Sequence, residues 1–214
     1  HLMLLTSFPA APALPLPTTK DYPNELNNVL RLYFNQLSQR LQNLSGGSGG
    51  QYLQTVYGAF SSYTTQTATA NTATLLTLSN TDFANGVSLS SNKIYAPISG
   101  IYNLQFSVQV QNTDNAPQDM FIWLRQGNDG GASTDITGST GVVGLPARKA
   151  VGDPFHTITG WNYFLSMVTN DYIQIYWSTT NANVSIPTYA ASGTPTKPST
   201  ASVVATLSFV SAVT

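Results

Sequence analysis

The carboxylates are the side chains of this chain best suited to acid–base chemistry, and their neighbours argue against that role. Nearly all of those after residue 51 lie beside turn-forming residues, where a carboxylate accepts hydrogen bonds from the local backbone. A glycosidase needs two carboxylates flanking the scissile bond. No spacing here marks such a pair, although one formed by folding or across subunits stays open. The carboxylates are Asp82, Asp114, Asp119, Asp129, Asp135, Asp153 and Asp171.

Nucleophilic and metal chemistry have less support still. His156 is the only histidine after His1, and no Gly-x-Ser-x-Gly motif accompanies it, so we expect it to cap or pack at a strand start. The absence of cysteine excludes thiolate catalysis and Cys-ligated zinc. The loop 128–135 offers Asp129 and Asp135 to a calcium ion, but a hairpin tip is the favoured interpretation. We predict a chain that is not an enzyme, with no catalytic residue, no metal site and no cofactor.

Carbohydrate binding is a further candidate chemistry. Exposed aromatic rings can stack on sugars, although aromatic residues of a β-sandwich more often serve its core or an interface. Polar loops between the expected strands would supply the hydrogen bonds. Those loops are residues 112–118, 127–138 and 181–197. The candidate receptor contacts are Asp129, Asp135 and Tyr189.

Charge is scarce in this chain. Only 8% of its 214 residues are charged, against about 25% in ordinary soluble domains. Eight Lys and Arg against nine Asp and Glu give no basic field, so we expect no nucleic-acid partner. No stretch approaches the ~20 apolar residues of a membrane helix, so we expect no membrane insertion. An apolar fraction of 42% is too high for a disordered chain.

Residues 1–23 predict an extended arm. Their five prolines remove backbone donors and favour extended chain over helix. A disordered terminus is the simpler interpretation, but the segment is more apolar than a solvated tail requires. The sharper interpretation is an arm that docks on another protein. The predicted docking residues are Leu4, Leu5, Phe8, Leu14 and Leu16.

Residues 24–45 predict a short helix, with Asn24 as its N-cap. Its apolar residues form a heptad-like stripe, and a lone helix of about this length is marginal in water. The stripe therefore needs a partner, either the following domain or copies of itself around a three-fold axis. The predicted trimer stem consists of Leu26, Leu30, Tyr33 and Leu37. Residues 46–50 are glycine and serine, which predicts a flexible linker.

Residues 51–214 predict a head made of short strands, rich in β-branched and aromatic residues and separated by turn signals. No helical pattern interrupts them, so the expected fold is mainly β, an antiparallel jelly-roll sandwich. Their polar faces carry Thr, Ser, Gln, Asn and Tyr, which can be buried against an identical neighbour without the cost of desolvating charge. The predicted strands are 55–67, 72–78, 93–96, 100–111, 119–126, 155–168, 171–179 and 201–213.

Three segments resemble the C1q/TNF-like jelly roll: KIYAPISGIYNLQFSVQVQ, FIWLRQG and YFLSMVTNDYIQIYW. In that fold a Gly-Ile/Tyr-Tyr strand follows a short strand, and a leucine-rich strand leads through a Gly-Asp turn into the next. Asn170-Asp171 stands at the place of that Gly-Asp turn. The resemblance covers roughly residues 55–212, and it implies a trimeric β-head.

Longer segments are similar to virion structural proteins of tailed phages, particularly marine ones. They include PNELNNVLRLYFNQL, YGAFSSYTTQT, HTITGWNYFLSM and PSTASVVATLSFVSA. The similarity implies a homotrimer displayed on the virion surface as a tail fibre or capsid decoration, and attached to other virion proteins by its N-terminal segment. Two alternatives stay open: a receptor-binding module for host surface glycan, and a polysaccharide depolymerase.

Overall fold

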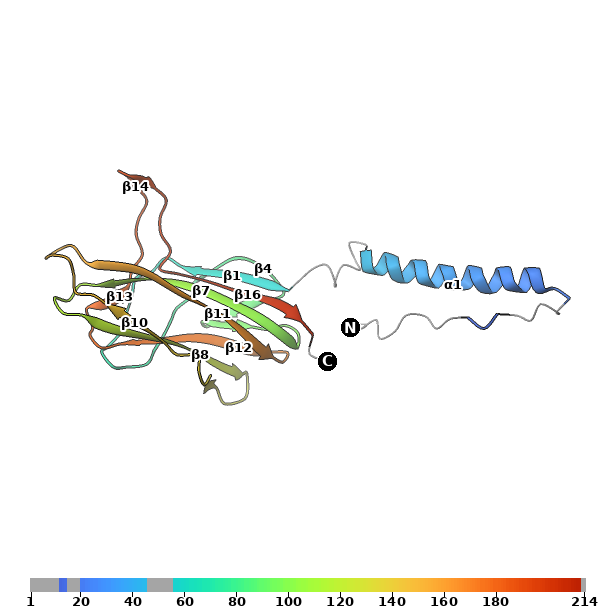
Figure 1. Cartoon of the computed structure of the whole chain (residues 1–214), viewed down its shortest axis with the longest axis horizontal. Coiled ribbons are helices and arrows are strands. Elements are labelled where there is room, and N and C mark those ends of the chain that lie inside the picture. Colours follow the sequence, from blue (N-terminus) through green and yellow to red (C-terminus); the bar gives the residue numbers. More distant parts are fainter. Residues whose placement is uncertain (1–11, 15–19, 46–55, 213–214) are drawn as a thin grey trace. The chain divides into compact units, whose positions relative to one another are not determined.

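The structure of the chain is a computed structural model that describes residues 12–14, 20–45 and 56–212 (Figure 1). The chain divides into two compact units, residues 1–55 and 56–214. The first unit contains the helix α1 (Tyr22–Ser45). The second contains every strand of the described residues. Helix and strands thus fall in different units, and each is described by itself below.

Helix α1 begins two residues before the predicted start. The backbone amides of Asn24 and Glu25 both donate to the carbonyl oxygen of Asp21 at 3.1 Å, and the Asn24 side chain donates to the Asp21 carboxylate at 2.6 Å. Asp21 is therefore the N-cap, and the prediction of Asn24 was wrong. Pro23 lies in the first turn, where its missing N–H has no intrahelical partner to lose.

The predicted stripe of α1 is less exposed than two apolar neighbours on the helix. Leu26, Leu30, Tyr33 and Leu37 are half-buried, whereas the neighbouring residues Leu32 and Phe34 are exposed. Phe34 contacts the Tyr33 ring edge-on at 5.8 Å, which widens the apolar surface of the helix beyond the predicted stripe. Within the described residues, no helix has the length and hydropathy needed to span a membrane.

The second unit is a sandwich of two antiparallel sheets. Sheet A follows the order β2-β13-β7-β16-β1-β4, with β11 paired to the other side of β7. Its strands are β1 (Tyr57–Ser62), β2 (Gln66–Thr67), β4 (Asn80–Asn85), β7 (Gly100–Asn112), β11 (Phe155–Met167), β13 (Val184–Ile186) and β16 (Val203–Ser211). Strands distant in sequence are thus neighbours, β16 lying between β7 and β1.

Sheet B follows the order β10-β8-β12-β6-β5, with β3 paired to β12 and β9 paired to β8. Its strands are β3 (Thr74–Leu75), β5 (Ser88–Ser90), β6 (Lys93–Tyr95), β8 (Gln118–Asn128), β9 (Thr134–Asp135), β10 (Gly141–Leu145) and β12 (Asp171–Thr179). A separate hairpin, β14 (Ser192–Gly193) with β15 (Thr196–Lys197), projects from the sandwich (Figure 1).

The core lies between the two sheets. Alternate residues of β7 from Tyr102 to Val110 are buried, and β12 contributes the fully buried Ile173 and Trp177 from the opposite sheet. The strands alternate as a half-buried sheet requires, because successive side chains point to opposite faces. The mainly β, antiparallel jelly-roll sandwich predicted from the sequence is confirmed.

The turn between β11 and β12 is held by a buried carboxylate. Asp171 accepts hydrogen bonds from the Val168 backbone amide at 2.9 Å and from the side chains of Gln126 and Asn128 at 3.0 Å. Asn170 adopts a left-handed conformation with φ 69°, which asparagine tolerates better than most residues. The Asn-Asp pair therefore forms the tight turn that the sequence comparison with Gly-Asp implied.

Trp161 joins the edge strands of the two sheets. From β11 in sheet A, its ring stacks on Phe106 with centroids 5.6 Å apart and lies over Gly141 of β10 in sheet B. A Cβ at Gly141 would be 1.7 Å from the indole. The Tyr163 hydroxyl adds a 2.8 Å hydrogen bond to the Gly138 carbonyl. The side of the sandwich between β11 and β10 is thus closed by aromatic side chains.

Replacing Gly141 with alanine tests this closure. We expect Gly141→Ala to lower the free energy of unfolding by about 1–3 kcal/mol, because the new methyl group displaces the indole. Chemical denaturation gives the stability, and tryptophan fluorescence reports the environment of Trp161. Gly144→Ala on the same strand is the control, since the nearest atom to its Cβ lies 3.8 Å away. Equal stability of both variants and the parent would contradict this packing.

Candidate functional site

The outer face of sheet A carries almost no charge. Strands β7, β11 and β16 contain no Asp, Glu, Lys or Arg, and their outward side chains are amides, hydroxyls, the His156 imidazole and isolated apolar groups. We call this surface the neutral face. It consists of Asn103, Gln105, Ser107, Gln109 and Gln111 of β7, His156, Ile158, Gly160, Asn162 and Phe164 of β11, and Val204, Thr206 and Ser208 of β16.

The neutral face ends at an unpaired strand edge. β11 pairs with β7 over all 13 of its residues, and no strand of the described residues pairs with its other side. Long exposed edges invite pairing with another chain unless lysine, proline or a bulge blocks them, and β11 has none of these. Its residues Ile158 and Phe164 are 64% and 66% exposed. This combination is typical of a contact surface.

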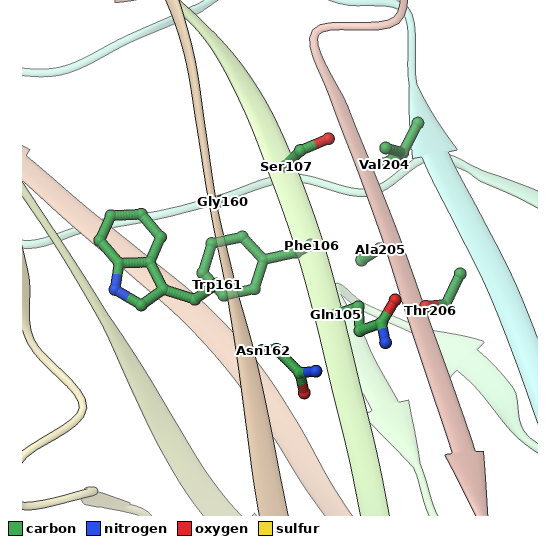
Figure 2. Close-up of a pocket in the computed structure, with 9 residues that line it drawn as sticks. All are labelled: Gln105, Phe106, Ser107, Gly160, Trp161, Asn162, Val204, Ala205 and Thr206. Atoms are coloured by element: carbon green, nitrogen blue, oxygen red, sulfur yellow. The ribbon is translucent and has the colours of Figure 1, made fainter.

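A shallow hollow of about 510 Å³ lies on the neutral face, across β11, β7 and β16 (Figure 2). Figure 2 shows Gly160, Ser107 and Val204 on three successive strands. Gly160 pairs with Ser107, which pairs with Val204, so the row is made of small side chains. An added Cβ at Gly160 would come within 2.4 Å of the Phe106 carbonyl oxygen. The face therefore combines apolar protrusions with a hollow.

Tyr189 and His156 meet at one end of the neutral face. The Tyr189 hydroxyl lies 2.8 Å from His156 Nδ1 and donates to the Gln111 side-chain oxygen at 3.3 Å. Burial raises the pKa of Tyr189. The exposed imidazole thus packs near the start of β11, as expected, and its hydrogen-bonding partner is a phenol. The predicted contact residue Tyr189 thus lies outside the strands and contacts sheet A through its side chain.

The other two predicted contact residues are Asp129, in the turn after β8, and Asp135, in β9 of sheet B, and each forms an ion pair. Asp129 accepts hydrogen bonds from Lys93 at 2.9 Å and from the Tyr95 hydroxyl at 3.0 Å. Asp135 accepts from Arg125 through both carboxylate oxygens, at 2.7 and 3.2 Å, and from the Trp123 indole at 3.0 Å. The structure does not bring Asp129, Asp135 and Tyr189 into one cluster.

The alternative of a calcium loop at 128–135 gains no support from this arrangement. The two carboxylates that would bind the ion are paired with different cations. In the described part of the chain, no three or more His, Cys, Asp or Glu side chains gather as metal ligands would. A calcium loop needs six or more oxygen ligands around one point.

Cations cover the outer face of β12, which the sequence had predicted to be neutral. Lys93 lies 4.1 Å from the Tyr172 ring centroid, and Arg125 lies 4.1 Å from that of Tyr176. Gln174, between the two tyrosines, is buried. The prediction of neutral outer faces on all strands was therefore wrong for sheet B, because long cationic side chains from β6 and β8 extend over the aromatic rings. The sequence did not reveal these two clusters.

The remaining predicted residues are in the first unit. Leu4, Leu5, Phe8 and Leu16 lie outside the described residues, and Leu14 is exposed. The stem residues of α1 form the half-buried stripe described above. Docking and trimerisation by these residues stay predictions.

The described head is thus a β-sandwich domain with a charge-free outer surface on sheet A. No protein-family model and no curated protein sequence match the chain. Among solved structures, the globular domain of the zebrafish complement 1qA protein aligns with a TM-score of 0.46 and 9% identity, over 75% of this chain and 100% of that domain. A likeness this distant carries no argument about function, and the fold assignment rests on the strand pairing described above.

Acidification tests the Arg125–Asp135 pair. The hydrogen bond from Arg125 lowers the pKa of Asp135 in the folded state, so the pair stabilises the fold above the ordinary carboxyl pKa and is lost as pH falls through the lowered one. We expect Asp135→Asn to be less stable than the parent at about pH 5, and the difference to shrink towards about pH 2. Urea unfolding at several pH values measures it. A difference independent of pH would contradict the assignment.

Proposed function

We propose that the chain is a non-enzymatic structural protein of a tailed-phage particle, and that its heads assemble as a homotrimer through the neutral face. The observation that carries the proposal is the charge-free outer surface of sheet A, bounded by the unpaired edge of β11. The resemblance of long sequence segments to virion structural proteins supports the phage particle as its setting. The head would then stand on the extracellular surface of the virion.

Desolvation energetics support self-association through this face. Moving an ionised side chain out of water costs several kcal/mol even after relaxation, whereas amides and hydroxyls need only exchange water for protein hydrogen bonds. The neutral face presents such groups between the apolar side chains of Ile158, Phe164 and Val204. Contact with another copy would also cover the edge of β11, which otherwise invites uncontrolled pairing.

The assembly proposed for this face is a ring of three copies. The protruding side chains of Ile158 and Phe164 and the hollow beside Gly160 are different parts of the face, so a protrusion of one copy can fill the hollow of the next. A contact between unlike patches is heterologous, and it gives a ring when the rotation closes. The apolar stripe of α1 provides a second element for the same three-fold association.

The predicted absence of catalysis is consistent with the positions of the carboxylates. Asp129 and Asp135 are ion-paired, and Asp171 serves a turn. His156 hydrogen-bonds to a tyrosine. These contacts give each group a structural role, so a depolymerase is not the function that this geometry supports.

Two lysine substitutions at exposed valines test the assembly. We expect Val204→Lys on the neutral face to weaken trimer formation at least about a hundredfold, because each contact would bury an unpaired ammonium group. Val142→Lys is the matched control. This valine lies on the outer face of sheet B and is 64% exposed, so the control should leave the mass unchanged. Sedimentation velocity over a range of concentrations measures both.

Three results of this experiment would contradict the proposal. The first is an unmodified chain that remains monomeric at micromolar concentration. The second is a Val204→Lys chain that assembles as tightly as the parent. The third is equal weakening by both substitutions. Circular dichroism of each variant separates loss of assembly from loss of fold.

Removing residues 1–23 tests the docking arm. We expect the shortened chain to keep its trimeric head and to lose incorporation into particles, because the apolar side chains predicted to dock are gone. Mass spectrometry of purified particles measures incorporation, with the full chain as control. Normal incorporation of the shortened chain would show that another segment attaches the protein.

A further inference from the structure

A second concave site lies on sheet B, within one protomer. Its volume is about 360 Å³, inside the range of small-molecule sites. Strand β5, strand β6 and the turns after β8 and β11 line it. Its polar residues are Ser88, Ser90, Tyr95, Asp129 and Asn170. Three segments distant in sequence, the β5–β6 hairpin and the turns after β8 and β11, thus place polar groups around one hollow.

Local structure fixes the walls of this site. Ser88 pairs with Tyr95 across β5 and β6, so their side chains are neighbours on the same face. Tyr95 packs edge-on against the buried Tyr172, with ring centroids 5.6 Å apart. Asn170 is held by its backbone amide, which donates to the Ala96 carbonyl at 2.9 Å. The lining is therefore positioned before any ligand arrives.

Asp129 is the acceptor that dominates the site. Both hydrogen bonds that it accepts, from Lys93 and from the Tyr95 hydroxyl, reach its oxygen Oδ1, which leaves Oδ2 for a ligand donor. Lys93 and Tyr95 also lower the pKa of Asp129, so the group is ionised at neutral pH. Hydrogen bonds to an ionised acceptor are stronger than those between neutral groups.

The charge balance selects a neutral ligand. The Asp129 carboxylate would repel an anion. A cation would compete with Lys93, which already lies 2.9 Å from that carboxylate. A neutral polyol instead donates a hydroxyl to Asp129 and exchanges hydrogen bonds with Ser88 and Ser90. The Tyr95 ring and the nearby Pro97 offer apolar surface to the C–H face of a sugar ring.

We propose that this hollow binds one neutral hexopyranose unit, with Asp129 accepting a hydrogen bond from a ring hydroxyl. The site rests on the second function predicted from the sequence, glycan recognition. It needs no contact between protomers, so it stands independently of the trimer. Of the three predicted contact residues, only Asp129 lines this hollow. Both carboxylate oxygens of Asp135 are already engaged, and the Tyr189 side chain contacts sheet A instead.

Saturation-transfer NMR with the full chain tests the proposal. The probes are the methyl glycosides of glucose, galactose, mannose and N-acetylglucosamine, with N-acetylneuraminic acid as the anionic comparison. We expect at least one neutral glycoside to bind in the millimolar range and the anionic sugar to bind more weakly. Asp129→Asn should weaken binding at least tenfold. Asp135→Asn is the matched control, an ion-paired carboxylate of sheet B outside this lining, and should leave it unchanged.

A variant that fills the hollow distinguishes loss of binding from a general loss of fold. Ser88→Phe leaves the Lys93–Asp129 pair intact and should block the site, because Ser88 is exposed in the lining. Three results would overturn the site: no neutral glycoside binds, both asparagine variants weaken binding equally, or only the anionic sugar binds. A chain that is monomeric yet binds a glycoside through Asp129 would overturn the trimer and keep this site.

Discussion

The cost of taking a charged side chain out of water divides this head into two unlike surfaces. Sheet A has one charged residue in its strands, Asp82, and that carboxylate accepts a hydrogen bond from Ser61 at 2.8 Å. Sheet B carries Lys93 and Arg125, each paired with an aspartate and lying over an aromatic ring. Because exposed pairs of this kind stay hydrated, sheet B suits solvent and small polar ligands. Sheet A suits burial against protein.

The edge of the sandwich between β11 and β10 is built around two aromatic side chains. Trp161 and Tyr163 on the inward side of β11 reach sheet B, where Gly141 leaves room for the indole. This packing fixes the twist and position of β11, so its outward residues Ile158 and Phe164 are displayed on a rigid strand. A contact surface on a rigid element loses little conformational entropy on association. In the proposed assembly, the closure between the sheets would therefore hold the neutral face in place.

The sequence predicted the elements with strong patterns and missed those without them. Strands β7, β11 and β12 were predicted within a few residues because β-branched and aromatic residues fill them. Strands β4 and β10 were missed because NTDFAN and GVVGL are rich in turn-forming residues. The pairing of Lys93 with Asp129 was also missed, because it depends on how segments distant in sequence meet. The alternation of apolar and polar residues shows which face of a strand is buried, but it does not show to which sheet the strand belongs. The cap at Asp21 was overlooked because Pro23 suggested a later start.

We propose that the neutral face is buried between copies while the outer face of sheet B remains open. Hydroxyl-radical footprinting of the full chain at micromolar concentration, read residue by residue by mass spectrometry, tests this claim most directly. In one protomer the side chains of Phe164 and Val142 are 66% and 64% exposed. We expect strong protection of Phe164 and Ile158 and normal reactivity of Val142. If Phe164 and Ile158 react as freely as their exposure in one protomer allows, the neutral face is not buried between copies.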